Sequence, residues 1–362
     1  MNIAMIGTRG VPACYGGFET CVEELGKRLV ARGHSVTVYC RKEYYDSCPD
    51  QYLGMNLIYL PCLRKKSVET LSHTFLSIWH AIRQNFDALM IFNAANSPIL
   101  LLPRLLGKKI AINTDGLEWK RGKWGRVGRS YYKFSEWFAT KIANRIISDS
   151  QGIQDYYLKR YKAKSVFIAY GAYPHQSNDP SLLQGIGVRP GEYFLQVTRF
   201  EPENNPLLTI HAFKQLETDK KLVLIGGAPY ESDYLSEIKK EINDNIIIPG
   251  PIYESNLLNE IWCNCFAYVH GNEVGGTNPA LLQAMGNRCF VIAIDVCFSR
   301  DVLDHCGIYF EKNIQSLSSK MNWSLENFSK MDKFKDLAVR RIKDMYSWDI
   351  IAEKYEKMFR SL

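Results

Sequence analysis

The 362-residue sequence has no uninterrupted apolar run long enough to cross a membrane. Its most apolar segment, ALMIFNAANSPILLLPRLL at residues 88–106, is broken by two asparagines, two prolines and Arg104. This segment predicts a buried strand, a turn and the start of a helix rather than a membrane span. The first residues, MNIAMIG, have no basic region ahead of a long apolar core, so we expect no signal peptide.

The ten cysteines contain no CxxC pair. A zinc site would therefore need ligands from distant parts of the chain. Several cysteines lie in apolar runs, such as CNCFAYV at 263–269 and CFVIAIDVCF at 289–298. This pattern is typical of reduced, buried thiols in a cytosolic protein, where disulfides are uncommon.

The GxGxxG fingerprint of dinucleotide-binding proteins is also missing. The loop GTRGVPACYGGFET, residues 7–20, has four glycines at a different spacing, and residues 40–42 (CRK) supply no acid for a ribose. An oxidoreductase is therefore disfavoured. Glycines ahead of a helix, with Arg9 beside them, favour an anion site; the alternative is that they only turn the chain.

Charge is divided unevenly along the chain. Residues 1–172 contain 25 basic and 13 acidic residues, and the remainder contains 20 basic and 25 acidic residues. A basic half beside an acidic half predicts two domains with different partners. The basic half favours an anionic partner such as phosphates or a membrane surface. Nucleic acid fits less well, because the basic residues form no continuous stripe and the second half is acidic.

Two sets of alternating strands and helices are present. The first starts at NIAMIG and includes HSVTVYC, NLIYLP, ALMIFN, KIAINT and RIISDS; the second starts at YFLQVTRF and includes KLVLIGG, NIIIPG, CFAYVHG and CFVIAID. Strands that are apolar throughout and joined by helices predict parallel sheets covered on both faces. The fold prediction is α/β, with two doubly wound Rossmann-like domains facing each other across a cleft.

The segment 170–192 is rich in Gly, Pro, Ser and Asn and is the expected linker. We therefore place an N-terminal domain at 1–172 and a C-terminal domain at 173–345. Residues 346–362 form a final helix that is expected to pack back on the N-terminal domain.

The loop NTDGLEWKRGKWGR, residues 113–126, follows a predicted strand at the edge where parallel sheets bind ligands. Asp115 and Glu118 are carboxylates, and Trp119 and Trp124 offer flat faces on which sugars stack. The alternative is a solvated basic turn with two core tryptophans.

The next stretch, residues 126–145, predicts a helix with two faces. Tyr131, Phe134, Phe138 and Ile142 lie on one face; Arg126, Arg129, Lys133, Trp137 and Lys141 lie on another. A basic face with an exposed Trp suits an anionic membrane surface. An ordinary surface helix with a solvated charged face explains the pattern equally well.

Three stretches in the second half suggest a site for a phosphorylated ligand. VTRFEPENN at 197–205 places Arg199 at the end of a strand, where its guanidinium suits a diphosphate, although a surface arginine is the alternative. GPIYESN at 250–256 offers Tyr253 for stacking on a base, which alone is a weak signal. HGNEVGGTNPALLQAMG at 270–286 is a glycine loop that opens an apolar helix.

Taken together, IGTRGVPACYGGFET, DGLEWKR, RFEPENN and EVGGTNPALLQAM resemble, in this order, the retaining family-four GT-B glycosyltransferases. They are most similar to bacterial capsule and O-antigen rhamnosyltransferases, and the similarity continues to YSWDIIAEKYEKMF at 346–359. The resemblance implies a glycosyltransferase (a hexosyltransferase) of polysaccharide biosynthesis that transfers a sugar with retained anomeric configuration. It implies dTDP-rhamnose as the donor, a lipid-linked saccharide as the acceptor, no cofactor and no metal. The implied location is the cytoplasm, peripheral on the inner face of the cytoplasmic membrane.

The resemblance and the residues together give the candidate site. The candidate catalytic residues are Asp115 and Glu273. The candidate donor-binding residues are Arg9, Gly16, Gly17, Arg199, Tyr253, Gly275, Gly276, Thr277, Asn278 and Gln283. The candidate acceptor-binding residues are Tyr15, Glu118, Trp119, Lys120 and Arg121.

The sequence departs from the family at two places. The family carries a Glu-x7-Glu pair, but here Gln283 stands at the second position and Gly275 at the first, with Glu273 the nearest substitute. The family also has a lysine five residues after the arginine, where this chain has Asn204. Gln283 keeps an acceptor oxygen, and a deoxyribose has one hydroxyl fewer to bind, so we expect activity to be retained. The alternatives are a GT-B-type NDP-sugar epimerase and a catalytically silent nucleotide-sugar-binding scaffold.

Overall fold

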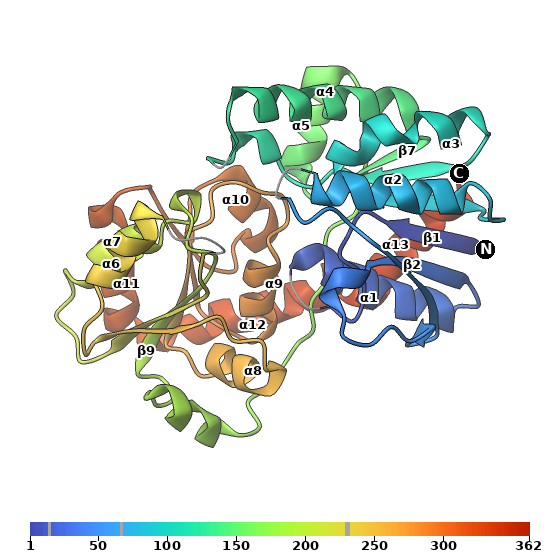
Figure 1. Cartoon of the computed structure of the whole chain (residues 1–362). Helices are drawn as coiled ribbons and strands as arrows, with labels where there is room; N and C mark the ends of the chain where they lie inside the picture. Colours follow the sequence, from blue (N-terminus) through green and yellow to red (C-terminus); the bar gives the residue numbers. More distant parts are fainter. Residues whose placement is uncertain (14–15, 66–67, 123, 229–231) are drawn as a thin grey trace. The chain divides into compact units, whose positions relative to one another are not determined.

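The computed structural model describes residues 1–13, 16–65, 68–122, 124–228 and 232–362. The chain divides into two compact units (Figure 1). The first unit contains Met1–Tyr170 together with Trp348–Leu362, and the second contains Gly171–Ser347. The final helix therefore belongs to the first unit, although the second unit separates it in the sequence from the rest of that unit.

The first unit is built on an eight-stranded sheet with the order β3-β4-β2-β1-β5-β6-β7-β8. Every pair is parallel except β3 with β4. The strands are β1 (Asn2–Ile6), β2 (Ser35–Arg41), β3 (Gln51–Tyr52), β4 (Met55–Leu60), β5 (Ala88–Phe92), β6 (Ile110–Asn113), β7 (Arg145–Ser148) and β8 (Val166–Phe167). The central strands are apolar and buried throughout, as expected when helices cover both faces of a sheet.

The second unit has a six-stranded, wholly parallel sheet with the order β11-β10-β9-β12-β13-β14. The strands are β9 (Tyr193–Val197), β10 (Lys221–Ile225), β11 (Ile246–Gly250), β12 (Ala267–His270), β13 (Val291–Ile294) and β14 (Ile308–Phe310). The prediction of two doubly wound α/β sheets is confirmed, and each strand named from the sequence is present.

Helices cover both sheets. Those of the first unit are α1 (Gly17–Ala31), α2 (Glu69–Ala81), α3 (Leu101–Leu105), α4 (Arg126–Ile142), α5 (Gln151–Tyr161) and α13 (Trp348–Arg360), with the 3₁₀ helices η1 (Lys42–Tyr44), η2 (Ala94–Leu100) and η3 (Glu118–Lys120). Those of the second are α6 (Pro206–Phe213), α7 (Asp233–Lys240), α8 (Ser255–Cys263), α9 (Pro279–Gly286), α10 (Cys297–Leu303), α11 (Ile314–Glu326) and α12 (Phe328–Met345), with η4 (Pro180–Ile186) and η5 (Pro202–Asn204).

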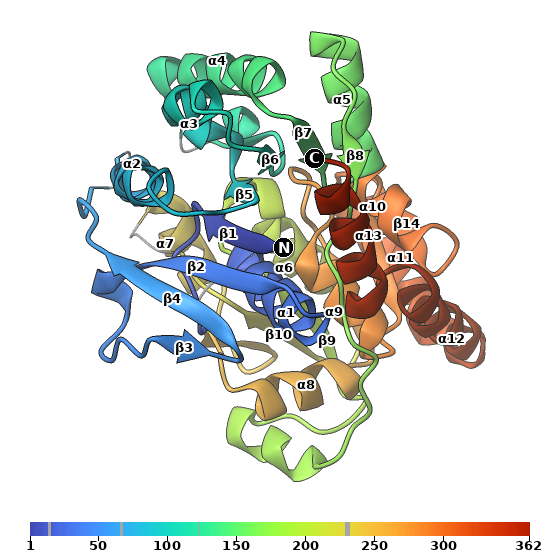
Figure 2. The same cartoon turned by 90° about the vertical axis from the view of Figure 1, so that its right-hand side faces the viewer.

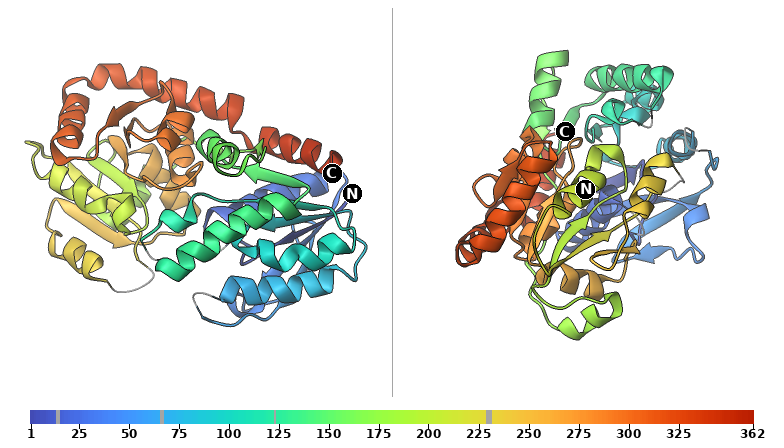
Figure 3. Two further views of the ribbon diagram at one scale, coloured as in Figure 1. Left: turned by 90° about the horizontal axis from the view of Figure 1, so that it is seen from above. Right: turned by 90° about the vertical axis from the view of Figure 1, so that its left-hand side faces the viewer.

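Side-chain caps explain where several helices begin. Ser150 accepts from the backbone N–H of Ile153 at the start of α5, and Asn313 accepts from the N–H of Ser316 at the start of α11. Such caps satisfy N–H groups that the first turn of a helix leaves without partners. In the first unit, α2, η2, α3 and α4 pack side by side (Figure 3, left), and α1 packs against α13 (Figure 2).

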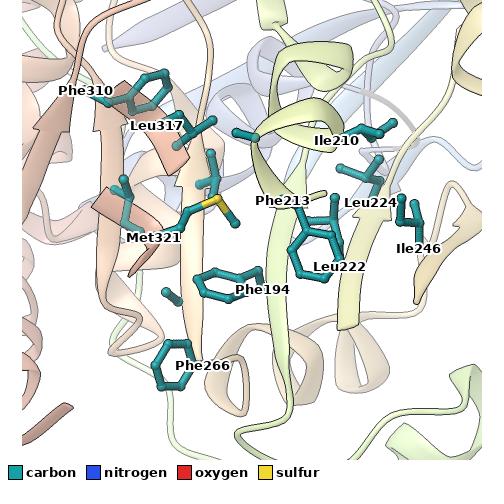
Figure 4. Close-up of a cluster of buried hydrophobic side chains, with 14 of the residues drawn as sticks. Phe194, Ile210, Phe213, Leu222, Leu224, Ile246, Phe266, Phe310, Leu317 and Met321 are labelled. Carbon is teal, nitrogen blue, oxygen red and sulfur yellow. The ribbon is translucent and has the colours of Figure 1, made fainter. Parts of the chain in front are cut away.

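The core of the second unit lies between its sheet and the helices α6 and α11 (Figure 4). Phe194 of β9 is at its centre, with ring centroids 6.1 Å from Phe213 and 5.2 Å from Phe266. Met321 and Leu317 of α11 close the cluster. This apolar core lies along the strands. Polar loops follow the carboxyl ends of β9 and β12.

The segment 88–106 folds as predicted into a buried strand, a turn and the start of a helix, namely β5, η2 and α3. Within the described ranges, no helix has the length and hydropathy to span a bilayer. None of the nine described cysteines forms a disulfide. The expectation that the thiols are buried is wrong for Cys48 and Cys297, which are exposed because they lie in a loop and on the first turn of a helix.

The predicted apolar face of α4 is present, and it is only partly buried. Phe134 stacks on Phe138 with ring centroids 5.8 Å apart, and it is 48% exposed. The buried side chains of α4 include Ser135 and Ala139, and the Ser135 carbonyl accepts a 2.7 Å hydrogen bond from Ser97 of η2. Small residues let η2 approach α4 closely, so the buried stripe includes Ser135 and leaves Phe134 facing solvent.

Both sheets have a point at which the strand order reverses, the usual ligand position in open α/β sheets. In the second sheet this point lies between β9 and β12. The loops that follow these two strands touch: Asn205 Nδ2 donates to the Gly271 carbonyl at 2.8 Å, and Thr198 Oγ1 to Asn272 Oδ1 at 3.1 Å. A Cβ at Gly271 would lie 2.6 Å from the Asn204 carbonyl oxygen. Only glycine allows this approach.

We predict that Gly271→Ala lowers the free energy of unfolding by about 1–3 kcal/mol, because the new methyl group forces the two loops apart. Gly227→Ala is the matched control, since its Cβ would meet only Pro251 at an ordinary 3.9 Å and should cost less than about 0.5 kcal/mol. Denaturant unfolding of both variants tests this prediction. Equal stability of the two variants would contradict the close approach.

Helix α13 is held to the first unit by ion pairs with α1 and the start of β2. Glu356 accepts hydrogen bonds from Arg32 Nη1 at 3.0 Å and Arg360 Nη2 at 2.6 Å, and its other contact is His34 Nε2 at 3.3 Å. Arg28 Nε donates to Asp349 at 2.8 Å. The donor from Arg32, followed by those from Arg360 and His34, lowers the pKa of Glu356 to about 2.

This lowered pKa predicts a pH-dependent stability. The folded-state pKa lies below the value of about 4.3 for an unfolded chain, so the contribution is complete above about pH 5 and is lost as the pH falls towards 2. Glu356→Gln should lower the free energy of unfolding by about 1 kcal/mol at pH 7. The difference from the native chain should shrink as the pH falls, which thermal melts at stepped pH will measure. Glu353→Gln on the same helix is the control, because the ion pair found for Glu353 among the described residues is an exposed one with Lys357; a pH-independent Glu356 effect would count against the ion pair.

Candidate functional site

In the first unit, the glycine loop after β1 lies at the point where the strand order reverses, between β1 and β5. Gly7 has φ of +105°, and a Cβ there would lie 2.5 Å from the Phe92 carbonyl oxygen. The Arg9 guanidinium lies 4.8 Å from the Tyr44 ring centroid, and the Arg9 carbonyl accepts from the N–H of Arg41. The loop is therefore fixed by β2 and β5 rather than open.

Two carboxylates of α1 take N–H groups of this loop. Glu19 Oε1 accepts from the Arg9 N–H at 3.0 Å, and Glu23 Oε2 accepts from the Ala13 N–H at 2.8 Å. Glu19 is buried, and burial raises the pKa of its carboxyl although the Arg9 N–H opposes that shift. Gly16 is the N-cap of α1 and Gly17 its first residue. A carboxyl side chain thus lies at the helix N-terminus where the sequence suggested a bound anion. Tyr15 lies outside the described residues.

The loop after β6 places Asp115 at the carboxyl edge of the same sheet. Asp115 has φ of +63°, and its carboxylate accepts from the Gly116 N–H at 2.8 Å. Its own N–H donates to Asn113 Oδ1 at 3.1 Å, and Asn113 Nδ2 donates to the Tyr355 hydroxyl of α13 at 3.1 Å. Helix α13 therefore orients Asn113, the residue that accepts a hydrogen bond from the Asp115 backbone N–H. A left-handed non-glycine residue at such an edge is typical of functional loops.

The other residues of this loop mainly contact one another. Glu118 is buried and pairs with Arg121, and Trp124 Nε1 donates weakly to Glu118 at 3.4 Å. The Lys133 ammonium lies 4.4 Å from the Trp119 ring centroid, and the ring centroids of Trp124 and Tyr132 are 5.0 Å apart. Both indole rings therefore have partners within the unit. Lys120 is exposed.

In the second unit, the loop between β12 and α9 forms a shallow hollow with the start of α10. Asn278 caps α9 by accepting from the Ala280 N–H at 3.0 Å, and Pro279 occupies the first helical position. Within the described part of the chain, the N–H groups of Gly275 and Gly276 have no hydrogen-bond partner. The hollow is lined by His270, Asn272, Val274, Gly275, Gly276, Asn278, Leu281, Phe298 and Ser299. Unsatisfied N–H groups ahead of a helix are suited to bind an anion.

Two polar side chains of this hollow are buried. His270 is 2% exposed, and burial lowers the pKa of its imidazole to about 3, so it is neutral at physiological pH. The Tyr268 hydroxyl lies 3.3 Å from His270 Nδ1. The Ser299 hydroxyl is buried and has no hydrogen-bond partner among the described residues. A buried hydroxyl without a partner in a hollow is suited to meet a polar ligand.

Arg199 is exposed at the carboxyl end of β9, where the sequence placed it. Asn204 does not replace the missing lysine as a cation; it is buried, and its Nδ2 donates to the Arg199 carbonyl at 2.9 Å. Glu273 Oε1 accepts from Asn205 Nδ2 at 2.6 Å and from Lys312 Nζ at 2.6 Å. Glu273 is therefore oriented by an amide and a cation at the edge of the same sheet.

The remaining candidates of the second unit lie near this edge but do not line the hollow. Thr277 is buried, Gln283 is half-buried on α9, and Tyr253 is 67% exposed in the loop after β11. The Gln283 side chain makes no hydrogen bond to any other described residue. Its amide is not needed by the protein interior, which leaves it available to a ligand.

Four residues of this edge were missed from the sequence: Asn205, Phe298, Ser299 and Lys312. Lys312 follows β14, 39 positions after Glu273 in the sequence, and no local pattern connects the two. The position of Phe298 and Ser299 at the carboxyl end of β13 was the one available signal, because ligand sites gather at those ends.

Two family models match separate parts of the chain. Residues 101–173 match a domain of unknown function (DUF1972), and residues 188–341 match "Glycosyl transferases group 1". The second match contains β9 to β14, including Arg199, Glu273 and the hollow.

Among curated proteins, the chain is 38% identical over 61 residues to an uncharacterised 42.6 kDa protein in the cps region of Klebsiella pneumoniae. It is 24% identical over 208 residues to the N-acetylgalactosamine-N,N'-diacetylbacillosaminyl-diphospho-undecaprenol 4-alpha-N-acetylgalactosaminyltransferase of Campylobacter jejuni. The matched regions are 16% and 56% of these two relatives. The match therefore spans at most 56% of the length of these curated relatives.

Solved structures of the same fold match over nearly the whole chain. Sucrose-phosphate synthase from Thermosynechococcus elongatus has a TM-score of 0.82 at 18% identity, with 99% of this chain and 98% of that chain covered. HepE of Anabaena, solved with UDP, has a TM-score of 0.79 at 16% identity and full coverage of both chains. The GT-B fold predicted from the sequence is thereby confirmed, and residues 188–341 of the second unit match the model of group 1 glycosyl transferases.

Proposed function

We propose that the protein is a retaining glycosyltransferase that transfers L-rhamnose from dTDP-rhamnose to a lipid-linked saccharide in capsule or O-antigen synthesis. One observation carries this proposal: the unpartnered N–H groups of Gly275 and Gly276 precede α9 inside the region that matches group 1 glycosyltransferases. A nucleotide-sugar diphosphate is the anion that such a loop would bind.

The diphosphate binds in the second unit in this proposal. In the first unit, Glu19 and Glu23 already take the N–H groups of Arg9 and Ala13, so an anion there would meet two carboxylates. The second unit offers N–H groups without partners, and Arg199 adds an exposed guanidinium. Gly16, Gly17 and Arg9 then shape the loop of the first unit, with Arg9 contributing long-range positive charge.

The leaving diphosphate gains charge as the glycosidic bond breaks, so groups fixed in advance around it stabilise the transition state more than the ground state. The N-terminus of α9 and Arg199 supply this effect without a metal ion. Glu273 is the catalytic candidate of this unit. Lys312 and Asn205 both donate to its Oε1, which fixes the direction of the carboxylate.

Gln283 is the residue that favours a deoxynucleotide donor. Its amide lies one turn into α9, half-buried and without a partner among the described residues. An amide both donates and accepts a hydrogen bond, which suits the single hydroxyl of a deoxyribose. Tyr253 is sufficiently exposed to stack on the base, and Thr277 and Asn278 complete the loop.

The first unit binds the acceptor in this proposal. Asp115, held on Asn113, is the catalytic candidate there, and Lys120 and Tyr15 are the proposed direct contacts. Glu118 and Arg121 shape the same loop by pairing with each other, and Trp119 packs against Lys133 of α4. The C. jejuni relative is named for a diphospho-undecaprenol acceptor, which supports a lipid-linked acceptor here. The protein would then work peripherally at the inner face of the cytoplasmic membrane.

The proposal predicts that the purified chain transfers rhamnose from dTDP-rhamnose to lipid extract containing glycosyl-diphospho-lipids, in buffer with EDTA. A panel of common NDP-sugars with radiolabelled sugar measures donor choice, and product NMR measures anomeric configuration. Release of isomerised donor without an acceptor would show an epimerase instead. Donor binding by calorimetry with no transfer from any donor would show a scaffold and would falsify the transferase proposal.

We also predict that Arg199→Ala lowers kcat/KM for the donor by the equivalent of about 2 kcal/mol, or about 30-fold, because a diphosphate loses a charge-assisted hydrogen bond. Arg189→Ala is the matched control, since Arg189 is equally exposed but precedes β9 at the opposite edge of the sheet. Steady-state kinetics of both variants will show whether the loss is specific to Arg199. Near-native kinetics for Arg199→Ala would remove Arg199 from the donor site.

A further inference from the structure

One side of the first unit exposes a concentration of large apolar side chains. Twenty such side chains are exposed in the described part of the chain, and nine of them belong to α2, α3 with its C-cap, and α4. These nine define the α2–α4 surface: Phe75, Trp79, Leu101, Leu102, Leu105, Leu106, Val127, Phe134 and Trp137. Single exposed apolar residues are ordinary, whereas a cluster on adjacent helices marks an interaction surface.

A groove runs through the centre of this surface. It has a volume of about 370 Å³, and every residue that lines it is apolar: Phe75, Ile78, Trp79, Pro98, Ile99, Leu101, Leu102 and Leu105. Helix α2 forms one wall, and η2 with α3 forms the other, the two lying side by side in Figure 3. Leu105 projects most, with 75% of its surface exposed, and Leu106 beside it is 55% exposed.

Exposed basic residues lie on the helices that form this surface and in the loops beside them. The Arg83 guanidinium lies 4.2 Å from the Trp79 ring centroid, so an aromatic ring and a cation share one position at its edge. Other exposed basic side chains of the same helices and loops are Arg104, Lys109, Arg126, Arg129, Lys133 and Lys141. An apolar surface with a tryptophan and a basic border is typical of proteins that lie on anionic bilayers.

The same helices show no exposed negative charge among their described residues. Their two acids are Glu69 and Glu136. Glu69 pairs with Arg41 at 2.7 Å, and Glu136 is buried and accepts from Tyr156 and Tyr161, both at 2.8 Å. Among the described residues of 68–142, the one exposed acid is Asp87, in the loop before β5. The exposed side of the three helices is therefore apolar and positive, with little of the mixed charge that is usual where a protein meets solvent.

We propose that the α2–α4 surface binds an anionic lipid bilayer, with Leu101, Leu105 and Leu106 inserted among the acyl chains and the basic border at the headgroups. This binding mode differs from electrostatic attraction alone between the lipid headgroups and the basic face of α4. Burial of leucines adds an apolar contribution that salt does not screen, and each basic residue near the surface strengthens binding by about fivefold.

This inference deepens the proposed function, because a lipid-linked acceptor lies in the same bilayer. It does not depend on that function, since vesicle binding is measured without donor or acceptor. A failure of membrane binding and a failure of catalysis are therefore distinguishable: the first is read from vesicles alone, and the second from transfer to a water-soluble acceptor analogue.

The first experiment mixes the full chain with vesicles of phosphatidylcholine alone or with added phosphatidylglycerol, and measures the bound fraction by sedimentation. We expect binding that requires phosphatidylglycerol and that weakens but persists in high salt. Vesicles with brominated acyl chains should quench the fluorescence of Trp79 or Trp137, measured by comparing the chain with Trp79→Phe and Trp137→Phe. Binding without quenching by brominated acyl chains would overturn insertion.

The decisive variant is Leu105→Glu with Leu106→Glu, which should weaken vesicle binding by at least about tenfold. Both side chains are mostly exposed, so the fold should survive, and thermal melting checks this. The matched control is Leu53→Glu with Leu182→Glu, which adds the same charge at exposed leucines outside the surface. The proposal fails if both pairs bind vesicles as the native chain does, or if both lose binding equally.

Two further outcomes would identify another occupant. Binding only to vesicles that contain a polyprenyl phosphate would assign the groove to that single lipid chain rather than to the bilayer. A dimer in light scattering that Leu105→Glu with Leu106→Glu converts to a monomer, without vesicle binding by either form, would assign the surface to a second copy of the chain. Either result would overturn the proposal.

Discussion

The candidate site of the second unit depends on one side chain, the amide of Asn205. Its Nδ2 donates both to the Gly271 carbonyl and to Glu273 Oε1, at 2.8 and 2.6 Å, and so joins the loop after β9 to the loop after β12. The absence of a side chain at Gly271 makes this approach possible. The contact fixes Glu273 on one side of the glycine loop that precedes α9, and Arg199 extends from the other strand. Groups fixed in this way need little rearrangement when charge develops on a ligand.

The two units share an architecture but use their first loops in opposite ways. In the first, Glu19 and Glu23 satisfy loop N–H groups from within, which stabilises the loop and places negative charge at the start of α1. In the second, the N–H groups of Gly275 and Gly276 have no partner among the described residues, and a neutral His270 lies beneath them. A glycine-rich loop before a helix is therefore not by itself an anion site. Whether such a loop can bind an anion depends on whether the protein already supplies hydrogen-bond acceptors for its N–H groups.

Much of the fold and of the candidate site was predictable from the sequence, because strands and helices follow from local periodicity and parallel sheets place ligands at one edge. Arg199 and the loop at 270–278 were found in that way. The pairing of Glu273 with Lys312 was not, since the two residues are 39 positions apart in the sequence and the order of β12, β13 and β14 brings them together. The partial exposure of the apolar face of α4 does not follow from a helical wheel, which cannot show that small residues, here Ser135 and Ala139, permit the closest approach of a neighbour.

The segment 88–106 contributes both to the core and to the exposed apolar surface of the first unit, a difference that its mean hydropathy does not show. Its prolines and Arg104 exclude a span, and its first part is the fully buried strand β5. Its last part is a short helix whose leucines contribute little to the core, since four of the six residues 101–106 are exposed leucines. Apolar residues that neither span a bilayer nor fill a core expose apolar surface to water, a cost that burial in a partner removes. In the proposed binding mode that partner is an anionic bilayer, and the segment lies on the membrane rather than crosses it.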